Sequence, residues 1–244
     1  MKRRWWQGQF FLFDDSPRLA FNASQRLRLI VIFLALEFLI RPLLRSTANR
    51  LHIATASWSA LLQMALLVAA ASLLIVGFAG VPLYQLGLRH WRQWTQTEVF
   101  YFLEILPLTV VIFFVIQFPT LKYLWIHHQA RLLGIVFVQQ MLWGFYQELL
   151  YRGIVQTMLA RGLGAAPGIL LANLIFTFGP LHFYHFALSR HDHAHLWIFA
   201  GIFAIGLYFA VLYHRSRNLW IIATLHGCGD FFIDGLAQIT RLLH

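Results

Sequence analysis

Residues 58–80 form an apolar run in which no side chain is charged. A helix of about 20 residues is long enough to cross the hydrocarbon core of a bilayer. Similar runs recur along the chain, and only 11% of its 244 residues are charged, against about 25% in a soluble domain. This composition excludes an ordinary soluble enzyme and a disordered chain. The runs are continuous rather than alternating, so they predict membrane helices and not a β-barrel.

The predicted fold is all-α, a polytopic transmembrane helix bundle of about seven to eight spans with a polar cavity between the later helices. The chain is too short for a transporter with two repeated six-helix halves, and no internal repeat is visible. We divide it into an N-terminal interfacial segment (1–28), N-terminal transmembrane helices (29–131), a core (132–236) and a tail (237–244). The expected spans are 29–44, 58–80, 99–118, 132–160, 167–186, 195–213 and 218–236, with an interfacial helix in 5–28 and a surface piece at 121–131.

The formal charge of +10 comes from arginines between the apolar runs. Loops that face anionic headgroups account for them better than nucleic acid does. The arginine distribution places the N-terminus in the cytoplasm, and residues 1–28 lack the features of a cleavable signal peptide. Cys228 is the single cysteine, so no intrachain disulfide can form.

Three of the expected spans contain pairs of chemically notable residues at i,i+4 spacing, which places both members on one helix face. The pairs are Glu148 with Arg152, Phe178 with His182, and His226 with Asp230. Each pair alone has a structural explanation: an ion pair, a packing histidine or a helix lock. Together they favour a functional site, because ionisable residues at membrane depth are costly.

The depths of these residues in the membrane agree. At 1.5 Å per helical residue, Glu148 lies roughly 20 Å and His182 roughly 22 Å from the turn 161–167. On the same scale His226 and Asp230 lie roughly 14 and 20 Å from Arg217. We therefore expect the fourth, fifth and seventh spans to bring these side chains into one layer.

Two other features are interpreted as structural. The histidines around residue 190 resemble a metal-binding tract, but a solvated loop is favoured; they are His185, His191, His193 and His195, together with Asp192. Cys228 lies beside His226 and could be a thiol nucleophile. Because Gly227 and Gly229 flank it, we expect it to fill space where helices approach closely.

With these residues the chain resembles the CAAX prenyl protease and bacteriocin-processing (CPBP) family of glutamate-dependent intramembrane endopeptidases. The family has an EExxxR motif, an FxxxH motif and an HxxxN or HxxxD motif on separate membrane helices. The corresponding residues are Gln147-Glu148…Arg152, Phe178…His182 and His226…Asp230. The resemblance covers roughly residues 132–236, and Leu86-Gly87-Leu88-Arg89 is similar to the stretch before the family core.

The resemblance implies that the residue at 147, helped by His182, activates the hydrolytic water. It further implies that His226 and Asp230 polarise the scissile carbonyl or bind the oxyanion, while Glu148–Arg152 holds the helix in register. No cofactor or metal is implied. The departure is Gln147, because an amide cannot accept the proton of water. Either the chain is an inactivated form, which the intact remainder of the motifs favours, or it is a diverged member in which Glu148 or Asp230 is the base, or a pseudoenzyme.

Two rival functions remain at this point. Glu148, His182, His226 and Asp230 could ligate zinc, although no HExxH helix is present. A non-catalytic protein could instead hold a peptide tail in the same cavity, and Gln147 favours that rival. The main expectation is an intramembrane endopeptidase that cuts near the C-terminal or membrane-anchored tail of a protein substrate. We expect it in the bilayer of a bacterial inner membrane, without a nucleic-acid partner.

Overall fold

The computed structural model describes residues 21–183 and 194–243, apart from 52 and 55. These residues form helices and connecting turns, and no strand occurs among them. The all-α prediction is therefore confirmed for the described part of the chain. The expected interfacial helix in 5–28 and most of the histidine tract lie largely outside these residues.

The N-terminal half contains long helices that include π-helical turns. A capping box begins the first: the Asn22 side chain accepts from the Gln25 amide, and the Gln25 side chain accepts from the Asn22 amide. The elements are α1 (Ala23–Ala35), η2 (Leu36–Ile40), α2 (Arg41–Arg50), α3 (Trp58–Leu73), η3 (Leu74–Phe78), η4 (Leu83–Leu86), η5 (Trp91–Gln93), α4 (Gln96–Phe100), η6 (Tyr101–Ile105) and α5 (Leu106–Ile126).

The C-terminal half carries the sequence motifs. Its first helix continues without interruption from residue 130 to residue 163 and ends at Gly164, whose φ of +89° suits glycine. The elements are α6 (Ala130–Glu148), η7 (Leu149–Gln156), α7 (Thr157–Leu163), α8 (Ala165–Phe178), α10 (Ala194–Ser216), α11 (Leu219–Asp230), η8 (Phe231–Gly235) and α12 (Leu236–Leu243).

Four helices in the described residues are long and apolar enough to cross a membrane. They are Trp58–Phe78, Glu98–Ile126, His195–Ser216 and Leu219–Leu243. The expected count of seven to eight spans is not confirmed. The helices 23–50 and 130–163 are long but carry several charged and amide side chains, and the apolar helix α8 is short, so length and composition do not mark them as spans.

Two helix ends differ from the sequence expectation. Helix α5 continues to Ile126 through Pro119, whereas 121–131 was expected to be a surface piece. Helix α8 ends at Phe178 and not at 186, because the residue before a proline is disfavoured in the α conformation and Gly179 precedes Pro180. His182 therefore lies in the turn after α8 rather than on the helix.

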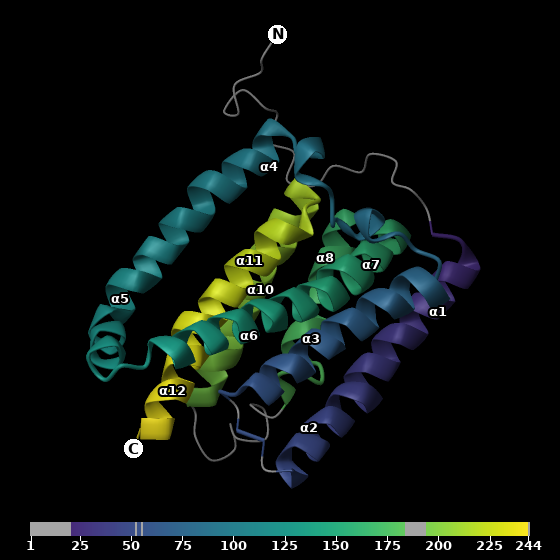
Figure 1. Ribbon diagram of the computed structural model, residues 1–244. Helices are drawn as coiled ribbons and strands as arrows, with labels where there is room; N and C mark the ends of the chain where they lie inside the picture. The colour runs from purple at the N-terminus through teal and green to yellow at the C-terminus, as the bar shows by residue number, and fades with distance from the viewer. Residues whose placement is uncertain (1–20, 52, 55, 184–193, 244) are drawn as a thin grey trace.

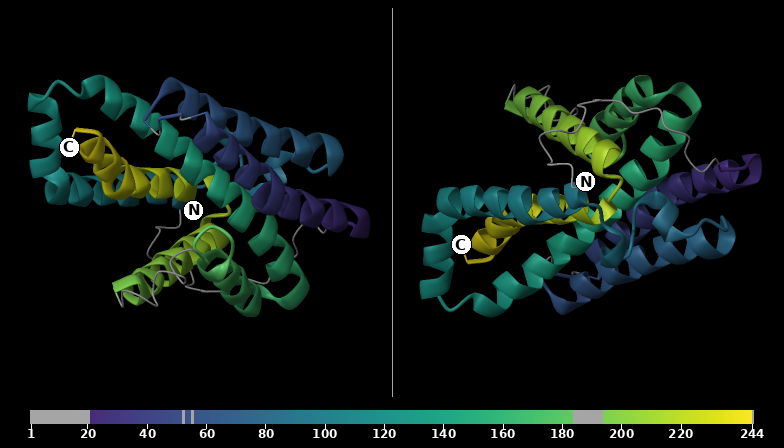
Figure 2. Two further views of the ribbon diagram at one scale, coloured as in Figure 1. Left: turned by 90° about the horizontal axis from the view of Figure 1, so that it is seen from below. Right: turned by 90° about the horizontal axis from the view of Figure 1, so that it is seen from above.

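The bundle is organised around α6 and η7. Helix α6 packs against α3 and α11, as Figure 1 shows, and α5 and α12 pack beside α11 and α6. On the other side α8 packs against α7 and α10, and both views in Figure 2 separate this group from α5 and α12. The π-helix η7 joins the two groups, because it contacts α1, α8, α10 and α11.

Two glycines allow the close crossing of α6 and α11. A Cβ atom added at Gly144 would lie 2.5 Å from the backbone nitrogen of Gly227, and one added at Gly227 would lie 2.7 Å from the Cα atom of Met141. Small residues of this kind let two membrane helices approach at backbone distance. The crossing places the end of α6 beside the motif residues of α11. Cys228 is buried here against Met141, with 4.0 Å between their sulfur atoms.

We predict that Gly227→Ala lowers the melting temperature of the protein in detergent, because the new methyl group meets helix backbone that cannot move aside. Gly134→Ala on α6 is the matched control, since no heavy atom lies within 4 Å of its added Cβ. Alanine is the better helix former by about 1 kcal/mol, so this control should keep or raise the melting temperature. Equal melting temperatures for both variants would contradict the close-crossing explanation.

Candidate active site

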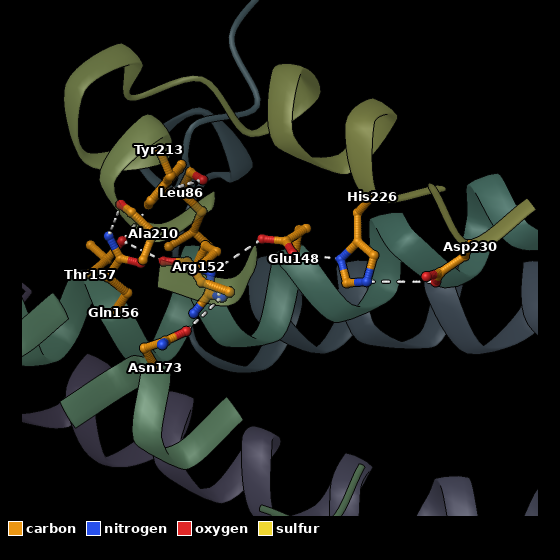
Figure 3. A network of polar contacts seen from close by, with 11 residues as sticks. Leu86, Glu148, Arg152, Gln156, Thr157, Asn173, Ala210, Tyr213, His226 and Asp230 are labelled. Carbon is orange, nitrogen blue, oxygen red and sulfur yellow. Dashed lines mark hydrogen bonds and ion pairs between the residues drawn. The ribbon is translucent and has the colours of Figure 1, made fainter. Parts of the chain in front are cut away.

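The two motif segments of α6 and α11 meet in a row of polar side chains. Nδ1 of His226 donates to Oε1 of Glu148 at 2.6 Å, and Nε2 of His226 lies 3.6 Å from Oδ2 of Asp230. The amide nitrogen of Gln147 donates to the same Asp230 oxygen at 3.5 Å. Figure 3 shows the row running from Asp230 through His226 and Glu148 to Arg152. The structure therefore brings together five of the predicted site residues: Gln147, Glu148, Arg152, His226 and Asp230.

Glu148 and Arg152 form a buried ion pair, with both side chains fully inaccessible. Nε of Arg152 lies 3.4 Å from Oε2 of Glu148. Nη2 of Arg152 donates to the Gly206 carbonyl at 2.8 Å and to the Asn173 side-chain oxygen at 3.4 Å. The guanidinium also lies over the Phe176 ring, 4.7 Å from its centroid. These contacts fit the rule that a charge inside a membrane protein finds a counter-charge or carbonyl partner.

Further polar contacts extend this arrangement along α10. The Gln156 side chain donates to the Ala210 carbonyl at 2.8 Å, one turn beyond the Arg152 contact on both helices. The Tyr213 hydroxyl donates to the Leu86 carbonyl at 2.9 Å and lies 3.2 Å from the Thr157 hydroxyl. The continuous helix 130–163 is thereby fixed to α10 and to the short helix η4.

The turn after α8 positions His182 on an aromatic ring that the sequence analysis did not single out. Nδ1 of His182 lies 2.9 Å from the Phe176 carbonyl oxygen, and its ring centroid lies 4.8 Å from that of Phe176. The centroids of Phe176 and His226 are 6.0 Å apart. Phe176 thus contacts both histidines. Phe178 is instead exposed and stacks on Phe199, because α8 ends there and the i,i+4 face with His182 does not form.

A second buried carboxylate lies behind the motif segment. Glu37 is fully buried, pairs with Arg41 at 3.1 Å, and accepts hydrogen bonds from the hydroxyls of Tyr146 and Tyr151, each at 3.1 Å. The i,i+4 spacing of Glu37 and Arg41 predicts the pair, but no sequence signal connects it to the two tyrosines. These contacts tie the first long helix to the opposite face of the helix that carries Gln147 and Arg152.

The accessible part of the polar row is at its α11 end. The side chain of Asp230 is 20% exposed and that of His226 is 10% exposed, whereas Glu148 is inaccessible. Water can therefore reach the Asp230 end of the group formed by Gln147, His226 and Asp230, in which Gln147 itself is 3% exposed. This group combines a carboxylate, an imidazole and a primary amide, which can accept a proton, relay it and donate a hydrogen bond to an oxyanion.

The two carboxylates do not share a point at which a metal ion could bind. Each faces a different nitrogen of the His226 ring, so the three groups form a row rather than a converging set. Within the described ranges no group of three or more His, Cys, Asp or Glu side chains is placed to hold a metal. His185, His191, Asp192 and His193 lie outside the described residues, while His195 lies at the start of α10.

Residues 128–232 match the family described as Type II CAAX prenyl endopeptidase Rce1-like. The matched stretch begins two residues before α6 and ends in η8, so it contains the whole polar row. This stretch belongs to the CAAX protease family. Comparison with curated proteins gave no match, and comparison with solved structures gave none either. The four candidate membrane helices and this family match together indicate an integral membrane protein that is related to CAAX proteases over residues 128–232.

A cavity of about 360 Å³ between the short helix η4 and the matched segment lies away from the polar row. Its walls come from η4, η7, α7 and α10 and include Gln156, Thr157 and Tyr213. Gln156 is two helical turns, or roughly 12 Å, beyond Glu148. The cavity borders the contacts with α10 but none of Gln147, His226 or Asp230.

We predict that Arg152→Ala destabilises this CAAX protease relative by about 3–5 kcal/mol, because it leaves Glu148 as an unpaired charge in an apolar interior. The measurement is the melting temperature in detergent. The control is Arg131→Ala, which removes an exposed arginine from the start of α6 and should change little. A melting temperature equal to that of the unmodified protein would show that Arg152 does not stabilise the bundle.

Proposed function

We propose that this protein is an intramembrane endopeptidase that hydrolyses a peptide bond near the C-terminal or membrane-anchored tail of a protein substrate. The observation that carries the proposal is the contact of Gln147, Glu148, His226 and Asp230 inside a bundle of apolar helices. The family of residues 128–232 supports it independently.

Peptide hydrolysis places three demands on such a site. A base must take a proton from water, a donor must stabilise the oxyanion, and the leaving amine must receive a proton. The group formed by Gln147, His226 and Asp230 contains an amide with two N–H groups, a histidine and a carboxylate beside it. His182 lies across the Phe176 ring from His226, and we propose that it helps to activate the hydrolytic water.

The Glu148–Arg152 pair has a supporting role in this proposal. Both side chains are inaccessible, so neither can touch the substrate in this arrangement. Arg152 compensates the charge of Glu148, and Glu148 accepts from Nδ1 of His226, which orients the ring. A carboxylate that fixes a catalytic histidine in this way has the role of the third member of a catalytic triad.

The location of the site indicates the kind of substrate. Of the four candidate membrane helices, 195–216 lies within the matched segment and 219–243 begins in it. A substrate tail that is itself lipid-anchored or apolar would therefore reach the site through the bilayer. We place the protein in a bacterial inner membrane with its N-terminus in the cytoplasm. The cytoplasmic location of the N-terminus is proposed from the arginine distribution.

We predict cleavage of a membrane-tail probe by the purified protein. Two probes are used: a farnesylated peptide that ends in the CAAX pattern, and a peptide that ends in an apolar anchor. His226→Ala should lower the cleavage rate of the cleaved probe by about 100-fold or more, because the proton relay and its orientation are lost. His127→Ala is the control, since His127 is exposed at the end of α5.

Chelation separates this mechanism from a zinc protease. If a carboxylate activates the water, EDTA leaves the rate unchanged; loss of activity that added zinc restores would contradict the proposal. Gln147 favours one further candidate, a non-catalytic peptide-binding protein or an inactive Glu-to-Gln form. Binding of a probe without turnover by the unmodified protein would support that candidate over an active protease.

A further inference from the structure

We propose that Asp230 is the general base of this site and that the Gln147 amide stabilises the oxyanion. The base then lies at position 230 and the oxyanion donor at position 147, an exchange that reverses what the family resemblance implies. The inference rests on the proposed endopeptidase function and names the groups that perform it. It makes Gln147 a working part of the site and not a sign of inactivation.

Accessibility selects Asp230 from the two carboxylates of the row. Glu148 is fully inaccessible and is held by both His226 and Arg152, so water cannot approach its oxygens. The Asp230 side chain is 20% exposed and its Oδ2 atom faces Nε2 of His226 and the Gln147 amide. A base must lie within hydrogen-bond reach of the water that it deprotonates. Asp230 is the carboxylate of the row that meets this requirement.

The Gln147 amide supplies the complementary donor. Its nitrogen carries two N–H groups, of which one points to Asp230 at 3.5 Å, and we assign the other to the oxyanion. The opposite amide orientation would place Oε1 against a carboxylate oxygen, so the contact itself fixes the amide. Oε1 is buried and has no hydrogen-bond partner among the described residues. A group inside the site that donates to this oxygen, such as a substrate N–H, would satisfy it.

His226 is oriented to pass the proton from Asp230 onward. Its Nδ1–H donates to Glu148 at 2.6 Å, which directs Nε2 toward Asp230. The ring is fixed further by Phe176 and Phe209, whose ring centroids lie 6.0 and 5.3 Å from its own. The imidazole therefore connects an accessible carboxylate with a buried one, and the buried one stabilises the imidazolium when it forms.

The charges of the site favour this assignment over a glutamate at 147. The row now contains two carboxylates, one arginine and one histidine. A glutamate at 147 would put a third carboxylate about 3.5 Å from Asp230, where two like charges cannot both ionise readily. An amide at one position and an acid at the other avoids this repulsion, whichever position carries the acid.

The resulting reaction is balanced. Asp230 takes a proton from water while the water oxygen forms a bond to the scissile carbonyl carbon, and the C=O π electrons move to the oxygen. The Gln147 N–H donates to this oxyanion. When the electrons return, the C–N bond breaks, and the proton passes from Asp230 through His226 to the leaving amine. The products are an acid and an amine, and Asp230 is again a carboxylate.

Four forms that differ little in shape test the exchange: the unmodified protein, Gln147→Glu, Asp230→Asn and the double variant with both changes. The unmodified protein should cleave the probe. Asp230→Asn should lose about 100- to 10,000-fold in rate because it has no base. Gln147→Glu should lose about 100- to 1,000-fold because the neutral donor is gone. The double variant should recover to within about tenfold of the unmodified rate, with the acid and the amide interchanged.

Two substitutions of the same chemical kind control for added or removed charge. Gln93→Glu in η5 and Glu104→Gln in η6 should leave cleavage unchanged, since both residues are exposed and neither belongs to the row. Melting temperatures of all forms in detergent show whether a loss of rate is a loss of folding. A variant that is inactive but melts as the unmodified protein does has lost chemistry alone.

The outcomes distinguish this inference from the proposed function. Faster cleavage by Gln147→Glu than by the unmodified protein, or full activity of Asp230→Asn, overturns the exchange and leaves the endopeptidase function standing. Two inactive single variants with an inactive but folded double variant also overturn it. If none of the four forms cleaves either probe, the proposed function fails and the exchange fails with it.

Discussion

A fully buried carboxylate in an apolar bundle is the constraint on which the site depends. Glu148 has no access to water, so its charge must be balanced by partners within the protein. It has two, Arg152 on its own helix and His226 on α11, and they lie at opposite ends of the carboxylate. The pair with Arg152 stabilises the charge, and the pair with His226 orients the imidazole ring to which we assign the proton relay. The same interaction therefore connects the stability of the bundle with the chemistry of its site.

The connection between α6 and α11 also requires backbone contact. Gly144 and Gly227 bring the two helices so close that a Cβ atom at either position would meet backbone atoms of the other helix. In this crossing Glu148 and His226 lie within direct hydrogen-bond reach, at 2.6 Å. On the opposite face Glu37 receives two tyrosine hydroxyls from the same helix, so the motif segment is held by polar contacts on both sides. An apolar surrounding strengthens each of these contacts because no water competes for them.

The sequence was a good guide to residues whose partners are close along the chain. The i,i+4 pairs Glu37–Arg41, Glu148–Arg152 and His226–Asp230 are all present, because helical geometry alone determines them. It was a poor guide where the chain turns or where partners come from distant helices. The expected Phe178–His182 face does not form, since Gly179-Pro180 ends α8, and Phe176 contacts His182 instead. The carbonyls that receive Arg152 and Gln156 belong to α10, and nothing in the local pattern points to them.

The side chain at position 147 has to be interpreted together with the residue that it faces. Position 147 faces position 230 across the crossing of two helices, so the chemistry belongs to the pair. Two acids would repel each other in an apolar surrounding and two amides would provide no base, whereas one acid and one amide provide both a base and a donor. The sequence motif specifies each position separately, and by that standard Gln147 is a departure from the expected glutamate. The structure places its amide against a carboxylate, and in the exchange that we propose Gln147 is the donor and Asp230 the base.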